Sequence, residues 1–278
     1  MLDFWHAAAE GALARNALLA ALLVSLSCGV VGSYVVVRRI SYIAAGVSHC
    51  VLGGIGAAQY LAVVWGITLI RPVHGAVAAA AASAALIGWV SLRRREREDT
   101  AISAVWSVGM AAGILFLHAT PGYGGDLMGY LFGNILLVGN SGLLTLAGLN
   151  LVVVALAWRF FREFQAVCFD EEFARLRNLR VDAHYILLLV MTALTVVALS
   201  MVVGVVLAIA LLTLPAAMAA RFARSLAQMM VIGALLCALF CVAGLTISYR
   251  PDLPVGPTII LIAGAAYLVS ALLPARRW

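Results

Sequence analysis

Long apolar runs without any charged residue constrain this chain more than any other feature of its sequence. Residues 185–218 contain no Asp, Glu, Lys or Arg. A helix that crosses a bilayer needs about 20 apolar residues, so this run alone is long enough for nearly two crossings. Of the 278 residues, 65% are hydrophobic and 11% are charged, and the charges cluster between the apolar runs. The chain is therefore predicted to be an all-α polytopic membrane protein with eight or nine transmembrane helices.

The apolar runs predict helices because they are too long and too uniformly apolar for the strands of a membrane barrel. We expect one transmembrane domain over residues 1–278. At residues 203–204 no polar loop separates two runs, so two helices and one broken helix both fit the sequence there. The nine predicted spans are 16–37, 43–65, 73–92, 100–118, 143–158, 184–202, 205–220, 229–247 and 257–273.

The basic residues predict the orientation of these spans. All 18 are arginine, and fifteen of them lie in alternate connections, on one side of the predicted membrane. Because Lys and Arg accumulate in cytoplasmic loops, we expect the C-terminus in the cytoplasm and the N-terminus outside. The net charge of +6 is dispersed over the ends of the spans, which does not favour binding to nucleic acid.

The absence of lysine excludes two kinds of chemistry. A P-loop needs a lysine on the nucleotide phosphates, and a Schiff base needs a lysine amine. The chain has none, so we expect it to be no enzyme itself and to bind no cofactor. Any ATP-driven work must then be done by a separate chain.

His49 is the leading candidate for chemistry, because an ionisable residue inside a span is costly to bury in lipid. Its neighbours Ser48 and Cys50 are further potential ligands, and Gly53, Gly54 and Gly56 are expected to leave room beside it. The structural alternative is a neutral histidine that is hydrogen-bonded between helices.

A second histidine, His118, ends the fourth predicted span. It could meet Asp126 in the exterior connection 119–142, whose Gly-rich, aromatic and apolar sequence suggests a partly inserted segment. The alternative for this pair is an interfacial histidine and a solvated aspartate.

The cytoplasmic connection at about 163–182 is predicted to contain a short amphipathic helix. Asp170 can cap it, and Glu171 and Glu172 lie in its first turn, where the helix dipole favours negative charge. Two interpretations stay open from the pattern alone: a helix lying on lipid, or a docking element for a soluble partner. The apolar residues that recur at helical spacing are Phe169, Phe173, Leu176 and Leu179.

An intramembrane serine protease is a further alternative, with Ser141 in a G-x-S-G pattern as nucleophile and His184 as base. The predicted topology opposes it. Ser141 lies at the exterior end of one span and His184 at the cytoplasmic end of the next, about 30 Å apart.

Six segments, in order along the chain, resemble the membrane permeases of ABC importers for zinc, manganese and iron. They include VVVRRISYIAAGVSHCVLGG and FDEEFARLRNL, and the resemblance covers nearly the whole chain. The six segments are residues 35–54, 99–117, 121–138, 169–179, 203–219 and 252–270.

This resemblance implies a fold similar to type II ABC importer permeases, in the inner membrane of a bacterium. It implies two cytoplasmic ATPase subunits that bind ATP, a second permease copy or homologue, and an extracytoplasmic solute-binding protein that delivers the divalent metal ion. It also implies that the cytoplasmic segment docks the ATPase. The docking residues would be Asp170, Glu171, Phe173, Ala174, Leu176, Asn178 and Leu179.

The chain departs from the family pattern at two positions. Ala45 replaces an aspartate that commonly lies four residues before the histidine, so the usual pair of ligands on one helix face is missing. Asn178 replaces a glycine, a mild change, because asparagine tolerates the left-handed conformation that ends a helix. An ion-coupled secondary carrier remains the alternative function. Such carriers usually need carboxylates inside the membrane, and the predicted spans have none well inside them.

Overall fold

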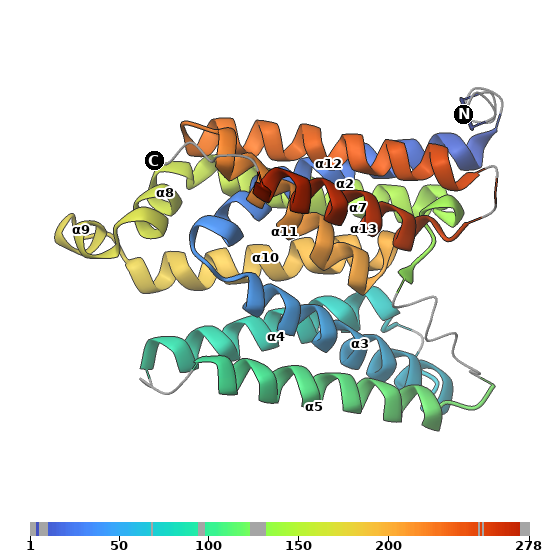
Figure 1. Cartoon of the computed structure of the whole chain (residues 1–278). Coiled ribbons are helices and arrows are strands. Elements are labelled where there is room, and N and C mark those ends of the chain that lie inside the picture. The colour runs from blue at the N-terminus through green and yellow to red at the C-terminus, as the bar shows by residue number, and fades with distance from the viewer. Residues whose placement is uncertain are drawn as a thin grey trace. The chain divides into compact units, whose positions relative to one another are not determined.

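The structure is a computed structural model of a helical protein, and it describes residues 4–5, 11–67, 69–93, 98–122, 132–249, 251 and 253–272. Within these ranges there is no β-strand, and Figure 1 shows the long helices and their connections. The helices and the one 3-10 helix are α2 (Ala12–Val37), α3 (Ser41–Val64), α4 (Pro72–Arg93), α5 (Glu98–Ala119), η1 (Ile135–Leu137), α7 (Asn140–Arg159), α8 (Phe161–Phe169), α9 (Glu171–Leu176), α10 (Val181–Val203), α11 (Val205–Phe222), α12 (Leu226–Tyr249) and α13 (Val255–Leu272).

Nine of these helices are long and apolar enough to cross a membrane, counting only the part of the chain that the structure describes. They are α2 to α5, α7 and α10 to α13, and each coincides with one predicted span to within a few residues. The all-α polytopic class predicted from the sequence is confirmed.

The chain divides into two compact units. Unit 1 comprises residues 1–38, 128–161 and 198–278, and unit 2 comprises residues 39–127 and 162–197. The long helix α10 contributes residues 181–197 to unit 2 and residues 198–203 to unit 1.

In unit 2, α3 packs against α4 and α5 at backbone distance. A Cβ atom at Gly53 would lie 2.7 Å from the carbonyl oxygen of Gly109, and one at Gly56 would lie 2.7 Å from that of Gly113. Gly54 lies in the same way against Gly75 of α4. Helices in lipid associate through such small residues, because lipid supplies no hydrophobic driving force between them.

In unit 1, α2 packs against α7, α11 and α12. Its contact with α7 includes a polar clamp inside the span. The Asn150 amide donates to the Leu23 carbonyl over 2.7 Å, and the Ser27 hydroxyl donates to the Asn150 side-chain oxygen. Asn150 is thereby satisfied within the protein, as a polar side chain at membrane depth must be.

The boundary at residues 203–204 separates two helices. Gly204 has φ +80° and ψ 163°, a backbone conformation that is essentially restricted to glycine. Gly133, with φ +57°, lies directly against the backbone of Val203 and Gly204. Of the two interpretations that the sequence left open, the structure supports a pair of separate helices.

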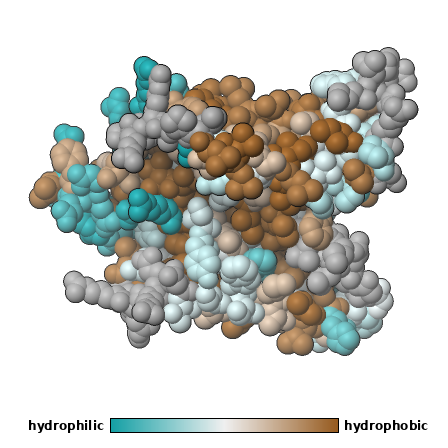
Figure 2. Space-filling view, viewed as in Figure 1, coloured by the Kyte–Doolittle hydropathy of each residue, from teal (hydrophilic) through white to brown (hydrophobic). Residues whose placement is uncertain are grey.

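The surface of the protein is divided into apolar and hydrophilic regions, as the sequence predicts. Figure 2 shows apolar side chains over α12 and α13, and hydrophilic side chains gathered around α8 and α9. On α12 the exposed residues include Val231, Leu235 and Leu239, each at least 59% exposed. A row of large exposed apolar residues of this kind is typical of a surface that faces lipid or another protein.

The glycine contacts in unit 2 predict a sharp difference between two alanine substitutions. Gly54→Ala places a methyl group into the backbone of Gly75, which cannot rotate away, so we expect a loss of about 1–3 kcal/mol of stability. Gly148→Ala is the matched control, because nothing lies within 4 Å of its Cβ position. Melting of the detergent-solubilised protein, followed by size-exclusion chromatography, should show a lower midpoint only for Gly54→Ala. Equal midpoints would contradict the packing of α3 on α4.

Candidate functional site

The three potential ligands on α3, Ser48, His49 and Cys50, differ in burial and in hydrogen-bond partners. The Ser48 hydroxyl is fully buried and donates to the Ala44 carbonyl over 2.8 Å. The Cys50 thiol lies 3.1 Å from the Val105 carbonyl oxygen of α5, to which it donates. Both groups therefore have partners within the bundle, whereas His49 is half-buried, with part of its side chain on an open face of α3.

The imidazole of His49 stacks on the indole of Trp106 from α5. The two ring centroids lie 4.4 Å apart, and the ring planes differ by only 7°. Ala45, one helical turn earlier, is also half-buried, so the missing aspartate of the family pattern would have been on the same face of the helix.

The three glycines of α3 do not leave room beside His49, contrary to the expectation from the sequence. The backbones of α4 and α5 fill the space at Gly53, Gly54 and Gly56. These glycines allow the helices to approach closely. A single sequence does not predict this contact, because it does not show which helices are neighbours.

The structure separates the two histidines that were considered as ligands. His118 is exposed in the last turn of α5, twelve residues beyond Trp106, which corresponds to roughly 18 Å along the helix axis. Asp126 lies outside the described residues. Within the part of the chain that is described, no three His, Cys, Asp or Glu residues are grouped as metal ligands would be.

The connection at about 163–182, which the sequence predicts to be cytoplasmic, folds as two short helices, α8 and α9, rather than one. As predicted, Asp170 caps α9, and its carboxylate accepts a hydrogen bond of 2.9 Å from the Phe173 amide. Glu171 and Glu172 lie in the first turn, where they interact favourably with the helix dipole. Figure 1 shows α9 projecting beyond the start of α10.

Asn178 ends α9 in the left-handed conformation, with φ +57°. The Asn178 amide donates to the Arg175 carbonyl over 3.0 Å, and the Leu179 amide donates to the Ala174 carbonyl over 3.1 Å. This pair of bonds is a Schellman motif. Asparagine therefore does here what glycine does in the family pattern, as the sequence predicted.

The apolar side chains of the segment are unequally exposed. Phe169 is 57% exposed, Phe173 51% and Leu176 82%, whereas Ala174 is fully buried and Leu179 is half-buried. An exposed aromatic and aliphatic row on a helix with a polar surround is a feature of docking surfaces.

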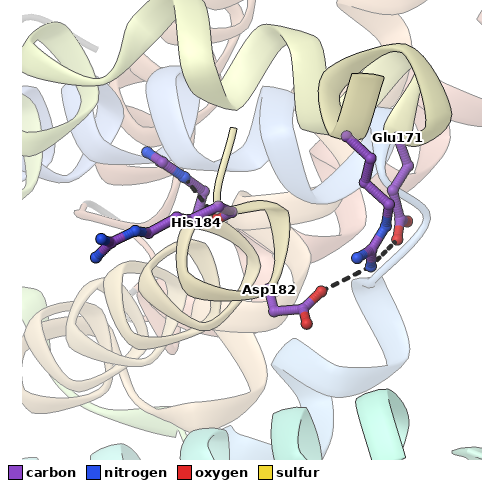
Figure 3. Close-up of polar contacts among 5 residues, drawn as sticks. Glu171, Asp182 and His184 are labelled. Atoms are coloured by element: carbon purple, nitrogen blue, oxygen red, sulfur yellow. Dashed lines mark hydrogen bonds and ion pairs between the residues drawn. The ribbon is translucent and has the colours of Figure 1, made fainter. Parts of the chain in front are cut away.

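Arg175 ties this segment to the start of α10 (Figure 3). Its guanidinium lies 2.9 Å from a Glu171 carboxylate oxygen and 2.7 Å from one of Asp182. The hydrogen bond to Glu171, followed by that to Asp182, raises the pKa of Arg175 above its ordinary value. All three side chains are open to solvent, so the pairs contribute orientation more than stability.

Ser141 and His184, the residues of the serine protease alternative, each have other local contacts. Ser141 lines a cavity of about 370 Å³ in unit 1, whose lining contains no His, Cys, Asp or Glu. In unit 2, the Nδ1 atom of His184 lies 2.8 Å from the Arg180 carbonyl oxygen (Figure 3). The His184 ring packs edge-on against Phe164.

A family model described as the ABC 3 transport family matches residues 11–274. The chain belongs to this family. The match spans both compact units and all nine candidate membrane helices. The chain is therefore a multi-pass permease of the ABC transporter type, and the protease alternative has no support.

Relatives and solved structures agree with membership of the ABC 3 transport family. The chain is 41% identical to a probable metal transport system membrane protein from Chlamydia trachomatis, over 92% of this chain and 87% of the relative. It is 32% identical to the manganese transport system membrane protein MntC from Halalkalibacterium halodurans, over 92% and 85%. A chain in the structure of PsaBC from Streptococcus pneumoniae in complex with Fab has a TM-score of 0.86 at 29% identity, over 98% of this chain and 96% of that one.

Two residues were missed by the reasoning from the sequence. Trp106 was not singled out, because only the tertiary packing of α3 on α5 brings it to His49. Asn150 did carry a signal, since it is a polar residue in the middle of a predicted span.

The Asp170 cap gives a prediction about the local order of α9. Asp170→Ala should cost about 1 kcal/mol of helix stability, whereas Asp170→Asn retains a capping oxygen. Hydrogen–deuterium exchange should accelerate at the Phe173 amide in the alanine variant and stay close to wild type in the asparagine variant. Equal exchange in both variants would mean that the cap does not hold α9.

Proposed function

We propose that this chain is the membrane permease of an ATP-driven importer for divalent metal ions. The family match over residues 11–274 carries the proposal. Relatives that are named as metal or manganese transport membrane proteins support a metal ion as the cargo. The ion is zinc, manganese or iron. The names of the relatives favour manganese, whereas imidazole ligation suits all three.

His49 is proposed as a transient ligand in the translocation path. Its imidazole lies on a half-open face of α3, while the side chains of Ser48 and Cys50 are engaged elsewhere. A single imidazole without the family's carboxylate holds a cation weakly, which suits a step that must release its cargo. His118 and Asp126 would contact the ion only at another depth of the path.

The energy for import is assigned to a separate ATPase. The chain has no lysine and therefore no ordinary P-loop. The exposed side chains of Phe173 and Leu176 on the capped helix α9, together with exposed Phe169 at the end of α8, support α9 as the docking element. The complete importer would contain two ATPase subunits, a second permease copy or homologue, and an extracytoplasmic solute-binding protein.

A secondary carrier is less well supported by the positions of the carboxylates. With the span of α5 counted from Thr100, after Glu98 and Asp99, the only Asp or Glu within the nine candidate spans is Asp182, the second residue of α10. Its carboxylate is paired with Arg175. A proton- or sodium-coupled carrier would need such a group deeper in the membrane.

Docking through α9 predicts a specific loss of the ATPase. Replacing both Phe173 and Leu176 by Asp should abolish co-purification of the ATPase, because it puts charge into an apolar contact, while membrane insertion stays normal. Glu172→Gln is the control, since it alters an exposed charge on the same helix and removes no apolar surface. If the double variant retains the ATPase, the docking site lies elsewhere, with the connection at 221–227 the next position to test.

The role of His49 predicts a loss of transport without a loss of assembly. His49→Ala should lower metal uptake at least about tenfold while ATPase binding persists. His74→Ala and His184→Ala are matched controls, because each of these histidines contacts a local backbone group. Uptake at the wild-type rate in His49→Ala would show that the histidine is a packing residue.

The proposed orientation places the N-terminus outside the inner membrane and the C-terminus in the cytoplasm. In intact cells, a cysteine at position 69 should react with an impermeant maleimide, and one at position 177 should be protected. Both positions are exposed in the structure, so the reverse labelling would invert the topology.

A further inference from the structure

His49 lacks the partner that usually orients a metal-binding histidine. Such an imidazole normally donates its second N–H to a carboxylate or a carbonyl, which fixes the plane of the ring. The structure gives His49 no hydrogen-bond partner within the described ranges, and the position one turn earlier is Ala45. Its defined contact is the stack on Trp106.

A stack of this geometry orients the imidazole ring without occupying either of its nitrogen atoms. The lone pair of an imidazole nitrogen lies in the plane of the ring. Parallel planes, 7° apart at 4.4 Å between centroids, mean that the indole covers a face of the imidazole and not its nitrogen-bearing edge. We infer that Trp106 is the positioning residue for His49, and that it sets the ring plane in which His49 meets the transported divalent cation.

Trp106 is itself held in place by neighbours on both helices. Its ring lies 6.2 Å from that of Tyr42, at an angle of 57°. The Tyr42 hydroxyl lies 2.8 Å from the Ser103 hydroxyl, so Tyr42 of α3 is linked to α5 one turn before Trp106. The backbone contact of Gly53 with Gly109 fixes the spacing of the two helices next to the stack.

This arrangement orients the imidazole without a hydrogen bond, at a site where Ala45 replaces the aspartate ligand of the family pattern. Stacking restrains the plane of the ring but forms no hydrogen bond, so neither nitrogen is committed before the cation arrives. Aromatic pairs contribute about 0.5–1.5 kcal/mol beyond their buried area. Without the stack the ring would have to be ordered when the cation binds, so its removal should weaken cation binding roughly two- to tenfold.

The inference rests on the proposed function, and the first experiment separates the stack from transport. The chain has six tryptophans, and replacing all but Trp106 by Phe leaves its emission alone. Without metal, His49→Ala should change the intensity and wavelength of that emission, and the control His74→Ala should not. Unchanged emission in His49→Ala would overturn the inference.

The second experiment uses Co²⁺ alone as a probe of the same full-length chain. Co²⁺ bound to the His49 edge should quench Trp106 emission saturably, and His49→Ala should abolish this quenching. Quenching that persists without the imidazole would place the cation elsewhere and overturn the positioning role.

The third experiment measures metal uptake by the assembled importer in cells. Trp106→Leu should raise the half-saturating metal concentration about two- to tenfold at an unchanged protein level, and Trp106→Phe, which keeps an aromatic face, should restore most of the affinity. If His49→Ala abolishes uptake but Trp106→Leu and Trp106→Phe show the wild-type half-saturation, the inference fails while the proposed function stands. If His49→Ala transports normally, the proposed role of His49 fails, and the inference fails with it.

Discussion

Close backbone contact between helices is the interaction on which the rest of this structure depends. In lipid there is no hydrophobic driving force that brings two apolar helices together. Their association therefore depends on van der Waals contact between surfaces that fit closely. In unit 2, glycines on two faces of α3 meet glycines of α4 and α5. In unit 1, Gly29 and Gly32 of α2 lie against the backbones of α12 and α11 in the same way. A side chain at these positions would push the helices apart.

The placement of the functional residues follows from this packing. On α3, which packs against α4 and α5, His49 is half-buried and is the one histidine of the helix. The same approach of α5 brings Trp106 to stacking distance from the imidazole. The segment that we propose as the docking element depends on different interactions, because α9 has only six residues. It is defined by its ends, an aspartate cap at the start and a left-handed asparagine at the finish. One chain thus combines a half-buried histidine held by tertiary contact with a surface helix held by local hydrogen bonds.

Local features could be predicted from the sequence, and features created by neighbouring helices could not. Hydrophobic length predicted all nine spans, and residue chemistry predicted the Asp170 cap and the left-handed Asn178. The separation of α10 from α11 stayed open, because only the backbone angles of Gly204 distinguish a break from a bend. Contacts that depend on which helices are adjacent could not be predicted in this way. The sequence did not identify Trp106 as the partner of His49. The prediction that Gly53, Gly54 and Gly56 leave space beside the histidine was wrong, because neighbouring backbones fill that space. The identity of the metal ion and the ATPase contact remain predictions.

We propose above that this permease moves a divalent metal ion with energy from a partner ATPase. Purified permease can be reconstituted into proteoliposomes with and without its ATPase and solute-binding protein, and uptake of radioactive manganese or zinc then measured. We expect accumulation to require both the ATPase and ATP and to be insensitive to an imposed proton or sodium gradient. Accumulation driven by an ion gradient in vesicles that contain the permease alone would contradict it.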